Sequence, residues 1–146
     1  MNIVAIRAQA EALVAAALGG GYRELPYQLQ PEMNDERSLA AGYAVTWGAG
    51  SQIENVSQVV NIEQGLKIYI TKRVFVRNDD DKVVTAVDDL YTASAAIVNK
   101  FCRDKLDLPG IVQRVKLVSM GEPRGIGEGR DIMSLSLDFR LQYTLA

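Results

Sequence analysis

The segment from Met133 to Leu145 alternates strictly between apolar and polar side chains. A period of two predicts an extended strand with one apolar face and one polar face. At about 3.3 Å per residue this strand is about 40 Å long, roughly twice the usual length. The segment therefore predicts a large sheet, and it favours a sheet edge that another chain can share. The apolar positions are Met133, Leu135, Leu137, Phe139, Leu141, Tyr143 and Leu145, and the polar ones are Ser134, Ser136, Asp138, Arg140, Gln142 and Thr144.

The bulk composition is that of one ordinary globular domain. The chain has 146 residues, of which 48% are hydrophobic and 23% are charged, and its formal net charge is -2. We therefore expect a single domain over residues 1–146, without the strong basic field of many nucleic-acid-binding proteins. No apolar run is long enough to cross a bilayer, and the first residues lack the pattern of a signal peptide. We expect no membrane partner.

Two residue counts exclude many kinds of site. The chain contains no histidine and a single cysteine, Cys102. Without histidine, Ser-His-Asp and Cys-His catalysis, histidine general bases and most mixed-ligand zinc sites are excluded. One cysteine excludes an internal disulfide and is typical of a reducing compartment. Its place on a helical apolar stripe predicts that Cys102 is buried in the core. We expect no metal and no cofactor.

Two segments have the apolar spacing of amphipathic helices. The first runs from Ile3 to Leu18 and is stopped by the triple glycine at 19–21, one residue of which we expect to form a left-handed cap. The second runs from Lys82 or Thr85 to about Lys105. Its predicted buried stripe consists of Val83, Val87, Leu90, Tyr91, Ser94, Ile97, Val98, Phe101 and Cys102.

The remaining segments have the composition of strands and connections. We expect a short strand over 43–47 that ends at the glycines of 48–50, a solvated loop over 31–38, and longer strands over 66–77 and 111–120. Lys72 interrupts the apolar face of the strand at 66–77, which indicates a bulge, a register change or an edge guarded by charge. The order of elements favours an α+β fold, with a mostly antiparallel sheet of four to five strands and two helices packed on one face.

The segment from Gly121 to Arg130 is rich in glycine. It lacks the Gly-Lys-Ser/Thr ending and the following helix that a phosphate-binding loop needs. Ten residues exceed the usual length of a hairpin loop, and long loops often serve contacts. We therefore expect either a plain flexible connection or a protein-contact loop, mobile in an isolated subunit and ordered in an assembly. The candidate contact residues are Arg124, Gly125, Gly127, Glu128 and Arg130.

Basic residues gather on the predicted strand at 66–77, with no acidic residue among them. Lys67, Arg73 and Arg77 share one face of that strand, and Lys72 lies on the other. Such a stripe can face phosphate or an acidic protein surface. The alternative is a solvated or edge-protected strand.

No catalytic or metal-binding constellation is present in the sequence. The aspartates at 79–81 and 88–89 lack the spacing, glycine and distal glutamate of a calcium loop, so they favour a solvated helix start. Nothing in the sequence buries the carboxylates of Glu32, Asp35 or Glu36, so they give no reason to expect a general acid. The aromatic side chains at 43, 47 and 91 have core spacing and predict packing. We expect no enzymatic activity.

Taken together, the order, lengths and local sequences of these segments resemble those of the tail terminator (tail completion) proteins of long-tailed bacteriophages such as phage lambda. The segments that carry the resemblance are Tyr43–Gly48, Leu66–Ile70, the helix with Asp88-Asp89-Leu90-Tyr91, the loop at 121–130 and the alternating strand. The likeness extends over nearly the whole chain.

The resemblance implies a structural virion protein that forms a hexameric ring. Such a ring caps the tail tube, ends tail polymerisation and forms the docking surface for the head or neck. The implied partners are other copies of the chain, the tail tube protein and a neck or head-completion protein, in a virion assembled in the host cytoplasm. Ring closure uses a heterologous interface between different patches. The alternative is a neck or head-completion connector that contacts DNA through the basic strand, as DNA passes through the ring. A carboxylate-dependent enzyme ranks last.

Overall fold

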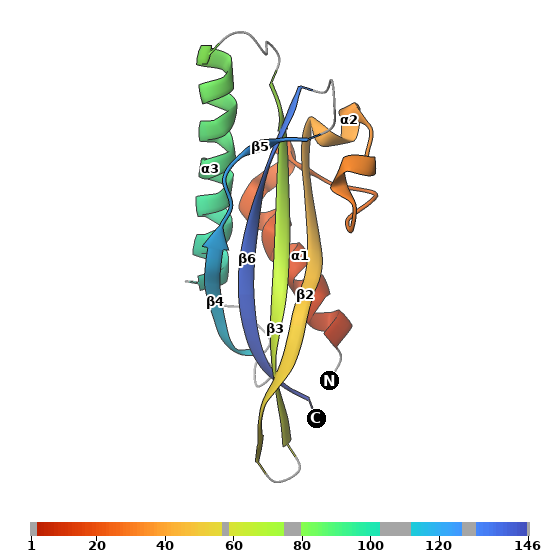
Figure 1. Cartoon of the computed structure of the whole chain (residues 1–146), viewed down its shortest axis with the longest axis vertical. Coiled ribbons are helices and arrows are strands. Elements are labelled where there is room, and N and C mark those ends of the chain that lie inside the picture. The colour runs from red at the N-terminus through yellow and green to blue at the C-terminus, as the bar shows by residue number, and fades with distance from the viewer. Residues whose placement is uncertain (1–2, 57–58, 75–79, 103–111, 127–130, 146) are drawn as a thin grey trace.

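The computed structural model describes residues 3–56, 59–74, 80–102, 112–126 and 131–145. Six strands form one sheet in the order β1-β2-β3-β6-β4, and β5 pairs separately with β6. Figure 1 shows the long strands β2, β3 and β6 side by side, with α1 and α3 packed along them. The elements are α1 (Ile3–Leu18), η1 (Gly19–Gly21), β1 (Arg23–Glu24), η2 (Pro31–Met33), α2 (Glu36–Leu39), β2 (Ala41–Val56), β3 (Val59–Arg73), α3 (Asp80–Cys102), β4 (Val112–Met120), β5 (Arg124–Gly125) and β6 (Ile132–Leu145).

The alternating segment forms β6, as predicted, but β6 lies in the interior of the sheet. It pairs with β3 over its whole length and with β4 on its other side, both antiparallel. The expectation that this strand offers an edge to another chain is therefore wrong. Alternation shows which face of a strand is buried, but it carries no information about how many strands lie beside it.

One face of the sheet carries the main core. Side chains from α1 and α3 pack there against alternate residues of β2, β3 and β6, and Phe101 of α3 stacks on Phe139 of β6. The predicted α+β class, the mostly antiparallel sheet and the two helices on one face are confirmed. The sheet has six strands rather than four to five, because β1 and β5 are two-residue strands too short to leave a sequence pattern.

The ends of α1 and α2 follow local sequence rules. Gly19, after the last residue of α1, has φ of +69°, which confirms the left-handed glycine cap. The segment at 31–38 is not the plain solvated loop that we expected. It contains η2 and the start of α2, whose N-cap Asp35 accepts a hydrogen bond from the Ser38 N–H at 2.8 Å.

The first long strand, β2, does not end at its glycines. It continues to Val56, with a bulge between Trp47 and Gly50. Gly48 and Gly65 lie so close across β2 and β3 that a Cβ on Gly48 would lie 3.3 Å from the Gly65 Cα. Glycine therefore serves here for close backbone approach and not as a strand terminator.

The second long strand, β3, starts at Val59 and ends at Arg73, earlier than the expected 66–77 at both ends. Lys72 sits in regular register with Ala41 and Met133, so the expected bulge or register change is absent at this position. Nor is β3 an edge, because it lies between β2 and β6. The Lys72 ammonium faces the helices, where it lies 3.9 Å from the Asp89 carboxylate.

The buried stripe of α3 differs from the prediction, most clearly at Tyr91 and Cys102. The helix is buried along Ala86, Leu90, Ala93, Ser94, Ile97 and Phe101, whereas Tyr91 and Cys102 are exposed. Each of these two residues lies one position after a buried one, which is about 100° around the helix. The small residues Ala86 and Ala93 are buried at positions that the predicted stripe did not include. The expectation that Tyr91 packs inside and that Cys102 is core is therefore wrong.

Candidate interaction surfaces

The described residues present surfaces for contact rather than an enclosed reaction site. One sheet edge, formed by β1 and the start of β2, is partly covered. The Leu25 N–H donates to the Tyr43 carbonyl at 2.8 Å, and the Arg7 guanidinium donates to the Val45 carbonyl at 3.0 Å. Arg7 also pairs with Glu11 at 3.0 Å, while burial raises the pKa of the Glu11 carboxyl against the lowering effect of Arg7. These contacts protect this stretch of edge from strand pairing.

The opposite edge of the sheet is β4. Within the part of the chain that the structure describes, β4 pairs only with β6, and Val118 is 53% exposed at a bulge. Its outer backbone donors and acceptors are available to a further strand. β4 is therefore the edge suited to pairing with another chain.

The sheet face turned away from the helices has a hollow of about 320 Å³ at its middle. Its floor is Gly48, Ala49 and Gly65, and Val118, Lys67 and Arg140 stand at its sides. In register, Lys116 of β4 lies opposite Arg140 of β6, and Arg140 lies opposite Gly65 of β3. The missing side chains of the glycines thus leave space beside two cations.

Ion pairs neutralise only part of the charge around this hollow. Lys67 lies 3.7 Å from Asp138, which also accepts a hydrogen bond from Ser119, and Arg140 lies 4.0 Å from Glu63. Arg114 and Lys116 are exposed and make no ion pair with any residue that the structure describes. We call Lys67 and Arg140, which line the hollow, together with its glycine floor and with Lys116 and Arg114 on the adjoining stretch of β4, the basic hollow. It attracts anionic groups, although the whole chain carries a net charge of -2.

The predicted basic stripe is only partly present in this arrangement. Lys67 joins the basic hollow, but Arg73 lies six residues along β3, about 20 Å away. Arg77 lies outside the described residues. The cations that lie near Lys67 were missed, because they come from β4 and β6, which only the sheet order brings together. Arg140 is one of the polar positions of the alternating segment at 133–145, and this pattern was the sequence signal that could have pointed to it.

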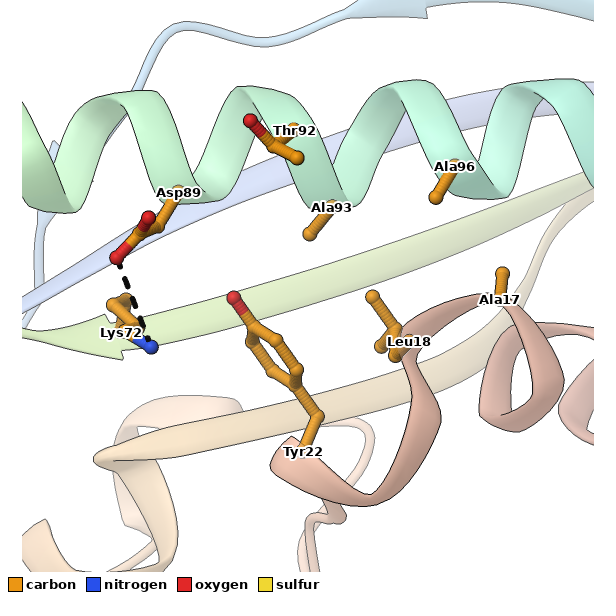
Figure 2. A pocket seen from close by; sticks show the side chains of 8 residues that line it. All are labelled: Ala17, Leu18, Tyr22, Lys72, Asp89, Thr92, Ala93 and Ala96. Atoms are coloured by element: carbon orange, nitrogen blue, oxygen red, sulfur yellow. Dashed lines mark ion pairs between the residues drawn. The ribbon is translucent and has the colours of Figure 1, made fainter.

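A second pocket, of about 290 Å³, lies where the end of α1 meets α3 and β3 (Figure 2). The Tyr22 hydroxyl points toward α3, and the Lys72 ammonium lies 5.3 Å from the Tyr22 ring centroid and 3.9 Å from Asp89. Burial, and secondarily the Asp89 charge, raises the pKa of Tyr22, so its phenol stays protonated at neutral pH. The Lys72 cation is paired and the Tyr22 phenol is neutral. The pocket lies at the junction of α1, α3 and β3, and we assign no reaction to it.

The glycine-rich segment is anchored over its first six residues. The Gly121 N–H donates to the Ser136 carbonyl at 2.8 Å, β5 pairs with β6, and the Ile126 N–H donates to the Ile132 carbonyl at 3.0 Å. Arg124 and Gly125 are exposed on this short strand. Gly127, Glu128 and Arg130 lie outside the described residues, so their contact role stays a prediction.

No metal-binding group of three or more carboxylate or cysteine side chains occurs within the described ranges. Nor is any helix of those ranges both long enough and apolar enough to span a bilayer.

Comparison with known proteins gives a structural likeness only. No family model matches the sequence, and no curated protein matches it. Among solved structures, the fold is similar to a chain in the virion of a native gene transfer agent particle. The TM-score is 0.55 at 16% sequence identity, and the alignment covers 96% of this chain and 92% of that chain. The two chains therefore have a similar overall fold.

Proposed function

We propose that this chain is a non-enzymatic structural protein of a phage-like virion. The observation that carries the proposal is the likeness to a gene transfer agent virion chain, which spans nearly the full length of both chains. The surfaces agree with the proposal, because the described residues offer an open strand edge at β4 and a charged sheet face. In the pocket between α1, α3 and β3, Lys72 is paired with Asp89 and the Tyr22 phenol is neutral.

Within the virion, we propose that the chain forms a closed ring, a hexamer in keeping with the tail terminator resemblance. The two edges of the sheet differ: one is the open strand β4, and the other is β2 with the short β1 beside it. Different patches on opposite sides of a subunit are what a head-to-tail ring requires. Such a ring would cap the tail tube, end its polymerisation and meet the neck or head-completion protein at the head-proximal end of the tail.

The oligomeric state of the purified chain tests the ring. We expect a ring-sized mass in solution, closed rings in electron micrographs, and binding of the rings to the ends of tubes of tail tube protein. The variant Val118→Lys adds a charge at the β4 edge and should shift the protein to monomers. Val84→Lys is the matched control, because Val84 is exposed to a similar extent, 56%, but lies on α3. A native chain that stays monomeric with and without tube protein would refute the proposal.

A second candidate is a neck or head-completion connector whose basic surface meets DNA. The observation in its favour is the basic hollow, in which Arg114 and Lys116 carry charges that no described carboxylate pairs. DNA binding by phosphate contacts weakens steeply with salt. We would measure retention of duplex DNA against salt concentration for the native chain and for Arg114→Gln with Lys116→Gln. Equal retention by both proteins would remove this candidate.

A further inference from the structure

The segment between β1 and α2 displays large apolar side chains. Tyr27 is 60% exposed, Leu29 is 83% exposed and Met33 is 61% exposed. Isolated exposed apolar residues are common on protein surfaces. These three lie on one seven-residue stretch, and large apolar side chains exposed close together are typical of interaction sites.

This stretch is held in one shape by a buried polar side chain, Asn34. The Asn34 amide donates to the carbonyls of Tyr27 and Pro31, both at 2.9 Å, and its oxygen accepts from the Tyr27 N–H at 3.0 Å. Asn34 itself is only 1% exposed. A loop fixed before binding loses little conformational entropy when it binds. We call residues 27–34 the Asn34-clamped loop.

The charge around the loop is negative. Glu32 lies within it, Asp35 and Glu36 follow directly, and Arg37 comes next; all four are exposed, so three carboxylates stand against one cation. The basic hollow has the opposite character, with Lys116 and Arg140 side by side above a floor of Gly48, Ala49 and Gly65. Lys116 and Arg140 are like charges directly opposite in the sheet, and the Glu63 carboxylate lies 4.0 Å from Arg140, so Lys116 is the cation of this pair that a further anion can neutralise. Val118 adds an apolar surface to the hollow for the apolar side chains of the loop.

The loop and the hollow are two different patches of the subunit. The loop follows β1, at one edge of the sheet, and Figure 1 shows α2 and the segment before it beside the upper end of β2. The hollow extends across the sheet face from Gly48 of β2 to Val118 and Ser119 of β4. Head-to-tail contact between two different patches is heterologous, so repetition of the contact generates a ring or a filament.

We propose that the Asn34-clamped loop of one copy binds in the basic hollow of the next copy. The inference rests on the proposed ring and assigns its interface. Carboxylates of Glu32 and Glu36 meet Lys116 and Arg140, and Leu29 covers the glycine floor beside Val118. A second copy of the chain fits both the positive charge and the apolar surface of the hollow, because its loop supplies negative charge and apolar area together.

Charge exchange between the two surfaces tests this pairing. Lys116→Glu with Arg140→Glu should raise the concentration for half-assembly about tenfold or more, and Glu32→Lys with Glu36→Lys should do the same. Asp35 is left unchanged because it caps α2. An equimolar mixture of the two double variants should assemble again, since each native surface then meets a native partner and each reversed surface meets a reversed one. Circular dichroism of each variant alone checks its fold.

Cross-linking gives an independent readout. With Cys102→Ser as background, Leu29→Cys and Val118→Cys in one chain should form disulfides between copies, up to a closed ring. Leu29→Cys with Val84→Cys, on α3, is the control and should give none. Failure of both the rescue and the cross-link, in a chain that still forms rings, would overturn this pairing and leave the ring standing. If the rings survive the charge reversal but lose their salt-sensitive retention of DNA, the pairing of loop and hollow is also overturned, and DNA is the ligand of the hollow instead. A monomeric native chain would overturn the ring itself.

Discussion

Phe101 of α3 and Phe139 of β6 stack with ring centroids 4.8 Å apart and planes inclined by 25°. Both side chains are fully buried, so this pair joins α3 to the interior strand β6. We expect Phe139→Ala to lower the free energy of unfolding by about 3–5 kcal/mol, because it removes buried surface and leaves a cavity. Urea denaturation measures the change. Tyr91→Ala, at an exposed position of the same helix, should change it by less than about 0.5 kcal/mol. Equal losses in the two variants would contradict this packing.

The close approach of Gly48 and Gly65 predicts a position-specific glycine effect. A Cβ on Gly65 would lie 3.3 Å from the Gly48 Cα, within a paired stretch of two strands. Gly65→Ala should therefore destabilise the protein by about 1–3 kcal/mol, the usual range for overpacking. In Gly20→Ala the added methyl meets nothing within 4 Å, so this control should be neutral or slightly stabilising. Thermal denaturation of the two variants compares them directly.

The hydrogen bonds of Asn34 predict that substituting it disturbs the loop at 27–34 rather than the whole fold. Asn34→Ala leaves the Tyr27 N–H and two carbonyls without this partner, at a cost of about 1–3 kcal/mol for buried groups. Asn34→Asp keeps the acceptor for the Tyr27 N–H but loses both donated bonds. Amide exchange at Tyr27 should therefore accelerate more in the alanine variant than in the aspartate variant. Equal acceleration in the two variants would show that the bond to the side-chain oxygen at position 34 does not protect the Tyr27 N–H.

Buried tyrosines predict a loss of stability in alkaline solution. Burial raises the pKa of Tyr22, Tyr43 and Tyr143 in the folded state, above the ordinary value of about 10. The folded state then holds these protons more tightly than the unfolded state. The stabilisation is complete below pH of about 10 and is lost as pH rises from there through the folded-state pKa values.

Urea denaturation across this pH range measures the effect. Tyr143 donates to the Gln64 side chain at 3.2 Å, and Tyr143→Phe removes its ionisable group while keeping the ring. The stability of this variant should fall less steeply with pH than that of the native protein. A native stability that does not fall above pH of about 10 would contradict the prediction.

Local patterns in the sequence predicted the elements, and they failed where distant residues decide the outcome. The apolar spacing of 3–18 and the alternation of 133–145 each depend on one buried face, so α1 and β6 follow from them. Gly48 suggested a strand end because nothing in the sequence shows that Gly65 lies against it. Cys102 differs from the buried Phe101 by one helical position, which is too small a rotation for a stripe pattern to resolve.

The candidate surface was harder to predict than the fold. Lys67, Lys116 and Arg140 belong to three strands that are far apart in the chain, and only the order β3-β6-β4 places them together. The basic stripe predicted on the single strand at 66–77 contained one of these three cations, Lys67. The Asn34-clamped loop was missed because its shape depends on side-chain hydrogen bonds within a segment whose composition suggested only solvation.

The interior position of β6 has a consequence for biosynthesis. During translation, both helices and the strands β2, β3 and β4 leave the ribosome before residues 132–145 do. Until then β3 and β4 lack the strand that separates them, and the apolar faces of α1 and α3 lack their central partner. Pairings between such distant segments form slowly, and incomplete sheets aggregate. A nascent chain therefore cannot complete its sheet before residues 132–145 have entered between β3 and β4.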